Sequence, residues 1–349
     1  MRVDGRLLLA GLATPARLRD LSGTAWAAML GLARRERVLG ILAQRVIGGG
    51  HIVPHPVRLA LEDALTVVAH RHREADWQAR RVARDLAGLE APVLLLKGTA
   101  YLLGGLDAAQ GRDPGDLDIL TPRAALDAVE QRLLAAGWRF AKTDAYDQHY
   151  YRAWMHELPP MSHAVRGGEL DVHHTWLPPV SGARIDIEAV VADSREGLYG
   201  YRLPCLEDLI LHSAAHLFAD GAMEALVRGL WDLDRLLRAL PSDDAASRAR
   251  LERRAERHRL QRPFARALRA CAKYLGTPCL APVAGDPLAA LVEARLTSAG
   301  QRGLNARATQ TALLARAHLI KMPVPLLVRH SIIKGWRTLR HPETQSLVD

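Results

Sequence analysis

The spacing of hydrophobic residues divides the chain into helical regions on either side of a short region of strands. Residues 1–90 carry apolar side chains at helix-like intervals, and the helical spacing returns after about residue 201. Between these regions, short apolar runs bounded by Gly and Pro are typical of buried strands. The pattern predicts an α+β protein with an N-terminal helical region (1–90), a small mixed-sheet core (91–200) and a C-terminal helical domain (201–349).

The first part of the core has the clearest pattern. The run "APVLLLKG" (91–98) predicts a buried strand. The segment "TAYLLGGL" that follows predicts a short helix that Thr99 can cap. "DLDIL" (116–120) predicts a second strand, which the following Thr-Pro ends.

The second part of the core begins with an amphipathic helix. "RAALDAVEQRLLAAGW" places Leu126, Val129 and Leu133 on one face, and Gly137 ends the helix. Residues 147–176 are expected to be extended: "DQHYYRAW" alternates loosely, and "HAVRGGELDVHHTW" predicts a strand, a tight turn and a second strand.

Composition narrows the class of protein. About half of the 349 residues are hydrophobic, but no apolar run approaches the length needed to cross a bilayer. The first twenty residues become charged too early for a secretory signal. The three cysteines (Cys205, Cys271 and Cys279) form no C-x-x-C pair, which favours reduced residues in a cytoplasmic protein.

The net charge of +9 raises the question of a nucleic-acid partner. Only five of the 47 basic residues are Lys, so the positive charge is carried by Arg spread along the whole chain. No stripe of basic residues is interleaved with aromatic ones. We therefore expect nucleic acid not to be the partner.

The first candidate for chemistry is the pair Asp116 and Asp118. Residues two apart on a strand share a face, so both carboxylates project together while Leu117 and Ile119 pack on the other side. Neighbouring carboxylates resist ionising beside each other. A divalent cation removes this conflict, and Mg²⁺ commonly binds one or two carboxylates together with substrate phosphates.

A third acid lies in "GELDVHHTW". On this strand Glu169, Asp171 and His173 share one face, and the apolar residues between them face the other. Asp171 is preferred as the third ligand because packed apolar residues flank it, and Glu169 remains the alternative. If this strand lies beside Asp116 and Asp118, three carboxylates converge, which is enough to hold two metal ions.

The turn Lys97-Gly98-Thr99 is a candidate phosphate site. A strand that leads through Gly into a helix presents backbone N–H groups to phosphate oxygens. Lys97 and Arg112 would neutralise further phosphate charge, and His173 would orient Asp171 or donate to a phosphate.

Three other features admit more than one interpretation. His212 and His216 have the i, i+4 spacing of a zinc site, but Ser213 stands where an H-E-x-x-H enzyme has Glu, so a role at the cleft or in a helix contact is favoured. Asp232 and Asp234 form a second D-x-D, but on a helix they point about 200° apart, so Asp232 is expected to pair with an arginine. The basic and apolar tail 318–340 would lie on a membrane surface or, since two prolines interrupt it, pack against the protein or a partner.

Taken together, "LLLKGTAYLL", "GRDPGDLDIL" and "ELDVHHTW" resemble the nucleotidyltransferase-fold superfamily, and in particular a bacterial family of nucleotidyltransferase-like proteins in which Lys-Gly replaces the usual Gly-Ser. "PCLEDLILHSAAHLF" and "VRGLWDLDRLL" are similar to the helical part of that family, so the resemblance covers residues 35–330.

The resemblance implies a metal-dependent transfer of NMP from an NTP, with ATP the expected donor, to an acceptor hydroxyl with release of pyrophosphate. The implied ligands of Mg²⁺ or Mn²⁺ are Asp116, Asp118 and Asp171, and Asp171 would also help to deprotonate the acceptor. The implied nucleotide-binding residues are Lys97, Gly98, Thr99, Arg112 and His173, with Thr99 standing in part for the missing Ser.

The acceptor implied by this resemblance is a small molecule or peptide held by the helical regions. Two alternatives remain. A nucleotide-binding scaffold or sensor would keep the fold with little or no turnover. An enzyme that adds nucleotides to RNA would show steeply salt-dependent RNA affinity.

Overall fold

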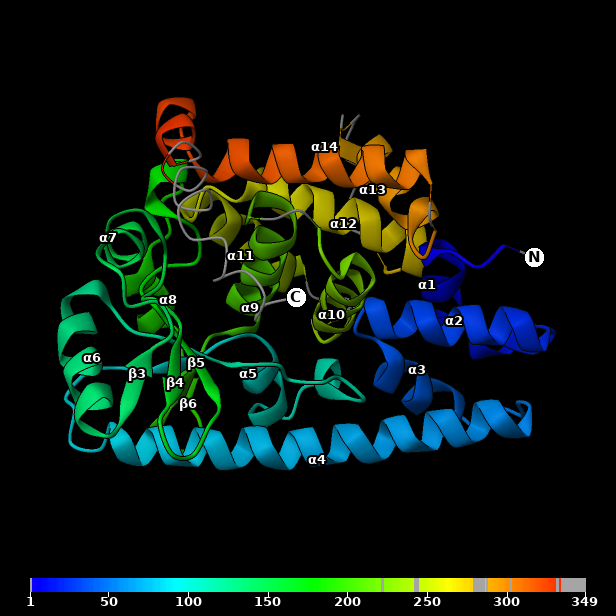
Figure 1. The fold of residues 1–349 in the computed structure, drawn as a ribbon, viewed down its shortest axis with the longest axis horizontal. Coiled ribbons are helices and arrows are strands. Elements are labelled where there is room, and N and C mark those ends of the chain that lie inside the picture. Colours follow the sequence, from blue (N-terminus) through cyan, green and yellow to red (C-terminus); the bar gives the residue numbers. More distant parts are fainter. Residues whose placement is uncertain are drawn as a thin grey trace.

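The computed structural model describes residues 2–220, 223–241, 245–278, 286, 288–301, 303–330 and 333. It confirms the α+β class: helices flank a seven-stranded mixed sheet. In Figure 1 the long helix α4 (His55–Asp85) runs along one side of the molecule, with the sheet above one end and the other N-terminal helices above the opposite end.

Helix α4 fits its sequence pattern closely. Its 31 residues bury a stripe that includes Val57, Leu61, Ala79 and Val82, and the arginines between them face outward. The helix packs against the strands and helices of the core, so it supports the sheet from below.

The helices outside the core come from both ends of the described chain. Those before the core are α1 (Gly5–Ala13), α2 (Gly23–Arg35) and α3 (Leu39–Val46). Those after it are α9 (Leu206–Ala215), α10 (Leu226–Arg238), α11 (Ala245–Arg257), α12 (Gln261–Leu275), α13 (Leu288–Ser298) and α14 (Leu304–Lys321). Because α1 packs against α10, α12 and α13, the beginning and the end of the chain share a hydrophobic core.

The sheet has the strand order β3-β4-β5-β2-β1-β7-β6. Its strands are β1 (Leu94–Leu95), β2 (Leu117–Leu120), β3 (Trp138–Phe140), β4 (Met161–His163), β5 (Glu169–His173), β6 (Arg195–Glu196) and β7 (Arg202–Leu203). The connecting helices are α5 (Lys97–Leu103), α6 (Leu126–Ala135), α7 (Ala145–Trp154) and α8 (Ile187–Ala192).

The central pair of strands fixes the position of the acids. β2 and β5 run parallel, and their register places Asp118 beside Asp171 and Leu117 beside Leu170. The apolar residues of both strands are almost fully buried on one face. The acids therefore share the opposite face of the sheet, as the alternation predicts.

Two local predictions are wrong. Residues 145–154 form helix α7 rather than extended chain, because the Asp144 carboxylate accepts hydrogen bonds from two backbone N–H groups and caps the helix. None of its residues is fully buried, so its helical period is weak in the sequence. The strand, turn and strand that follow are confirmed as β4 and β5.

Thr99 is not a helix cap. Helix α5 already begins at Lys97, so Thr99 lies inside it, and its hydroxyl is buried without a hydrogen-bond partner. Lys97 has a φ of 47°, which is the left-handed region, and this sharp turn starts the helix two residues earlier than the Thr signal indicates.

The C-terminal tail is described only in part. Helix α14 ends at Lys321, and a second helical stretch, Val324–His330, is bent by 112° relative to it. Among the described residues no single helix has the length and apolar character to cross a membrane, although this bent pair together meets both criteria. Most of the segment 331–340, and Cys279, lie outside the described residues.

Candidate active site

Asp118 is the centre of the acid face. Its carboxylate is buried, with Lys97 Nζ 2.5 Å and His173 Nε2 2.9 Å from Oδ1. Burial by itself would raise the pKa of Asp118, but the charge of Lys97 and the contact with His173 outweigh it and hold this pKa far below its usual range. Asp118 is thus a fixed negative charge.

Asp171 lies beside Asp118 and has the opposite character. Burial and the negative charge of Asp118 raise the pKa of Asp171 to about 7. The ligand atoms of Asp118, Asp171 and His173 lie within 4.8 Å of one another, which is close enough to hold one metal ion. Two acids forced to such different protonation are typical of functional sites.

Asp116 lies on the same strand face but at its exposed edge, next to Glu169. The charge of Asp116, followed by partial burial, raises the pKa of Glu169. Within the described residues, neither acid belongs to the compact group around Asp118. The structure therefore brings Asp118 and Asp171 together and leaves Asp116 paired with Glu169.

The turn before α5 is held by its neighbours. A Cβ at Gly98 would overlap Arg112 Nη1 and the backbone of Pro114, so only glycine allows the loop 112–115 to pack here. Gly98 thereby positions Lys97, whose amine reaches Asp118.

Arg112 is buried and already has partners. Its Nε donates to both oxygens of Asp232 at 3.0 and 3.1 Å, and its Nη1 donates to the backbone oxygens of Asp113 and Pro114. This confirms the expectation that Asp232 pairs with an arginine. The ion pair joins α10 to the loop that precedes β2.

A basic pocket of about 630 Å³ opens beside Lys97, between the core and the C-terminal helices. Its charged and histidine lining residues are Arg35, Arg37, Lys97, Arg112, His212, His216, Glu224, Arg228, Asp232, Arg295, His318 and Lys321. The positive charges outnumber the two acids, so the pocket suits an anion.

The surroundings of Arg228 indicate most clearly that the positive charge of the pocket is not balanced by acids. Burial, followed by the charges of Arg112 and Arg37, lowers the pKa of Arg228. Among the described residues, no ion pair with Arg228 is found. A partly buried arginine held near two others is destabilising unless an anion binds there.

His212 and His216 line the same pocket. His212 is buried, its ring lies 5.5 Å from that of Trp176, and burial with the nearby charge of Lys97 holds its pKa well below the usual value. In the part of the chain that the structure describes, no third ligand completes a metal group with these two histidines.

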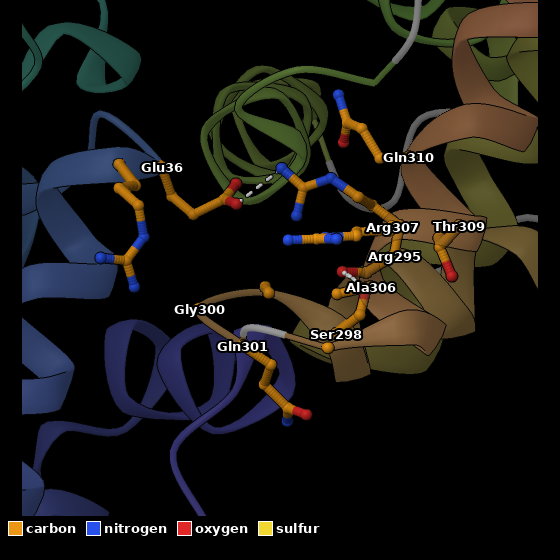
Figure 2. Close-up of a pocket in the computed structure, with 12 residues that line it drawn as sticks. Glu36, Arg295, Ser298, Gly300, Gln301, Ala306, Arg307, Thr309 and Gln310 are labelled. Carbon is orange, nitrogen blue, oxygen red and sulfur yellow. Dashed lines mark hydrogen bonds and ion pairs between the residues drawn. The ribbon is translucent and has the colours of Figure 1, made fainter.

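A second pocket, of about 610 Å³, shares Arg35, Arg295 and Gln310 with the first. Figure 2 shows Arg295 and Arg307 lying side by side in it, with the Arg295 guanidinium reaching Glu36 at 2.7 Å. The N-terminal and C-terminal helices together form this pocket, so the basic surface continues away from Lys97 between the two helical regions.

Sequence reasoning missed several residues of the site. Arg37 and Arg228 belong to no sequence motif, and it is the tertiary fold that brings them together as lining residues of one pocket. Tyr151 lies on the mispredicted helix α7, where burial and the charges of Glu157 and Asp171 raise its pKa to about 12. The pair His156-Glu157 was the one missed signal readable in the sequence, because both residue types bind metals.

A mixed sheet that carries paired acids on the adjacent strands β2 and β5, with a lysine at the start of helix α5, is typical of a nucleotidyltransferase-like core. The chain belongs to the uncharacterised nucleotidyltransferase family, whose sequence profile matches residues 22–276.

Comparisons with curated proteins and with solved structures do not narrow the function further. No curated protein matches the chain. Among solved structures, the crystal structure of JHP933 from Helicobacter pylori is similar over 80% of this chain and 98% of its own, with 16% sequence identity and a TM-score of 0.32.

Proposed function

We propose that the protein is a metal-dependent nucleotidyltransferase that moves NMP from an NTP to an acceptor hydroxyl. The observation that carries this proposal is the position of Asp118 and Asp171: the two acids sit side by side on adjacent strands, and Lys97 links them to a basic pocket. Family membership supports the reaction class.

The donor set fits a divalent ion. Asp118 and Asp171 supply carboxylate oxygens within 4.8 Å of each other, and the raised pKa of Asp171 reflects a repulsion that a cation would remove. We assign Asp116, on the same face, as the third carboxylate of the set. When bound, Mg²⁺ or Mn²⁺ would neutralise these carboxylates and polarise the phosphate that is transferred.

The basic pocket beside Lys97 is the proposed site of the NTP. Its volume is ordinary for a ligand of this size, and Arg228, which has no ion pair within the described residues, offers the charge that a triphosphate needs. Lys97 would bridge the phosphates and Asp118. Gly98, Thr99 and Arg112 support the turn and the loop, since the Thr99 hydroxyl is buried and the Arg112 charge is paired with Asp232.

In the proposed reaction, the acceptor oxygen forms a bond to the α-phosphorus as the bond from that phosphorus to the β-bridging oxygen breaks. Pyrophosphate leaves with the bonding electrons, and Asp171 takes the hydroxyl proton. His173, which contacts Asp118, keeps that carboxylate in place. Positioning and charge neutralisation would supply most of the rate enhancement.

We infer that the acceptor is a small molecule or peptide with a negatively charged group. The pocket in Figure 2 continues the basic surface between the helical regions, where an acceptor was expected. An anionic acceptor would complement Arg307 and Arg35, which line it.

The experiment is nucleotide transfer from labelled ATP with Mg²⁺ in a cell extract, followed by pyrophosphate release. Wild-type protein should label an acceptor, and a D116A/D118A double variant should not. Equal labelling by the double variant would refute the assignment.

A nucleotide-binding scaffold or sensor is the second candidate, because the Thr99 hydroxyl is buried and the turn presents no exposed hydroxyl where related enzymes use Ser. Calorimetry with ATP and Mg²⁺ separates the two functions. Binding without pyrophosphate release in any extract favours the scaffold.

A further inference from the structure

A second group of metal-binding side chains lies directly behind the acid face. It consists of His156 and Glu157, from the segment before β4, and His173 at the end of β5. All three side chains are mostly buried, His173 almost completely. The nucleotidyl-transfer chemistry described above uses neither His156 nor Glu157.

The backbone holds this group in a fixed arrangement. Residues 156–158 pair with the end of β5: the Leu158 N–H donates to the Val172 carbonyl, and the His174 N–H donates to the His156 carbonyl, both at 2.9 Å. Glu157 and His173 form an antiparallel bridge. Side chains on a paired backbone of this kind keep their positions without help from a loop.

The distances suit a small metal ion. His173 Nδ1 lies 3.5 Å and His156 Nε2 lies 3.6 Å from Glu157 Oε2. Ligands at about 2.0–2.1 Å from a tetrahedral zinc ion lie about 3.3–3.4 Å from one another. Each imidazole nitrogen therefore lies from the carboxylate oxygen at the spacing of two ligands rather than at that of hydrogen-bond partners, which approach more closely, and the three ligand atoms lie within 4.8 Å of one another.

His173 provides an independent indication of a missing ligand. Its Nδ1 is buried and has no hydrogen-bond partner among the described residues, although it faces the Glu157 carboxylate. A buried polar atom without a partner costs about 1–3 kcal/mol. A cation bound at Nδ1 would satisfy this nitrogen, and the Glu157 carboxylate that it faces would be a second ligand.

We propose that His156, Glu157 and His173 bind a transition-metal ion, with Zn²⁺ as the probe, at a site distinct from the carboxylate site for Mg²⁺. Two imidazoles and one carboxylate are the ligands of zinc and of other first-row transition metals, whereas Mg²⁺ prefers oxygen.

This site would act on the catalytic face through His173. With Nδ1 on the metal, the Nε2–H donates to Asp118 Oδ1 at 2.9 Å. In this chain of contacts from metal to imidazole to carboxylate, the metal fixes the orientation of the His173 ring, and the ring fixes the position of the Asp118 carboxylate. His156 and Glu157 are therefore positioning residues for Asp118.

The test measures metal retention by the full-length protein without nucleotide, so it does not depend on the transfer reaction. Protein loaded with Zn²⁺ is dialysed against buffer containing excess Mg²⁺, and bound zinc is measured by atomic emission. Wild type should retain one zinc. His156→Gln and Glu157→Gln should bind it at least about tenfold more weakly, since even outer partners of zinc ligands contribute about 10–100-fold.

Two control variants make the result specific. His70→Gln removes an exposed histidine of α4, and Asp171→Asn removes a ligand of the carboxylate site only; both should retain zinc like wild type. Zinc retention unchanged in His156→Gln and Glu157→Gln, or no zinc retained by wild type, overturns the proposal.

X-ray absorption at the zinc edge of the loaded wild-type protein gives a readout that needs no variant. Scattering from two imidazole rings is expected. A first shell without imidazole also overturns the proposal, even if the variants fail to fold.

Discussion

The molecule contains two D-x-D sequences, and they behave in opposite ways. Asp118 lies on strand β2 and Asp116 immediately precedes it, so their side chains share a face, while Asp232 and Asp234 lie on helix α10, where they diverge. Identical spacing thus places two acids on one face in the first region, Asp118 beside Asp171 and Asp116 beside Glu169. In the second region it gives two separate ion pairs.

The two regions also differ in how their charges are compensated. On α10, Asp232 accepts two hydrogen bonds from Arg112, and Asp234 is bound by Arg235, Arg238 and Thr277. On the sheet, Asp118 has Lys97, but among the described residues no cation forms an ion pair with Asp171, whose pKa is raised to about 7. Fully compensated acids indicate a structural role, and an uncompensated acid indicates a place for a ligand.

The largest expected effect is that of Asp171→Asn on transfer. Loss of a metal ligand removes several kcal/mol of transition-state stabilisation, so the rate should fall by about a thousandfold or more. Thermal stability should not fall, because the substitution relieves repulsion with Asp118. Transfer from labelled ATP and a melting curve measure the two effects. A variant that melts at a lower temperature yet keeps its activity would give Asp171 a structural role in place of a metal-binding one.

The matching change on the helix is Asp232→Asn. It leaves Arg112 buried beside a neutral amide, and breaking a buried ion pair in this way costs about 3–5 kcal/mol of unfolding free energy. Urea denaturation should detect the loss. Unchanged stability would mean that Arg112 is held by its backbone contacts alone, and that Asp232 is available for a ligand.

These differences set the limit of what the sequence could predict. The alternation around Asp118 and Asp171 is a local property, so the shared face and the two strands were predictable from it, and the helix-like spacing of apolar residues in 1–90 likewise predicted helix there, where α4 lies. Helix α7 was not, because it buries no complete face and a single cap at Asp144 decides its structure. The tertiary pairing of Arg112 with Asp232, 120 residues apart, leaves no trace in local spacing beyond the expectation of some arginine.

The basic pocket illustrates the same limit for the site. Apart from Arg112, its arginines come from α2, α10 and α13 and from the loop after α2, and each of these looks like an ordinary surface charge in the sequence. Only the fold shows that Arg228 lies near Arg37 and Arg112. The high Arg content, which on its own suggested a compositional bias, is in part concentrated at this pocket.

Arg228→Gln tests that pocket, with a smaller expected effect. Hydrogen bonds to charged groups are worth about 1.5–3 kcal/mol, so the KM for the NTP should rise about tenfold or more. The melting temperature should stay the same or rise, because repulsion with Arg37 and Arg112 is removed. Arg235→Gln, which removes a partner of Asp234 on the same helix, is the control: it should lower stability and leave the KM unchanged.

The smallest effect is expected from Glu169→Gln, which settles the choice of third acid. Glu169 is exposed, and its nearest charge is Asp116 rather than the group around Asp118. Exposed substitutions of this kind usually change free energies by no more than about 0.5 kcal/mol, which corresponds to about twofold in rate. Glu169→Gln and Asp171→Asn each remove one carboxylate charge from the same face of β5. Comparing their activities shows whether the place of the carboxylate matters or only its charge. If both variants lose activity equally, any carboxylate on this face is sufficient for metal binding, and the close pairing of Asp171 with Asp118 is not what makes the site.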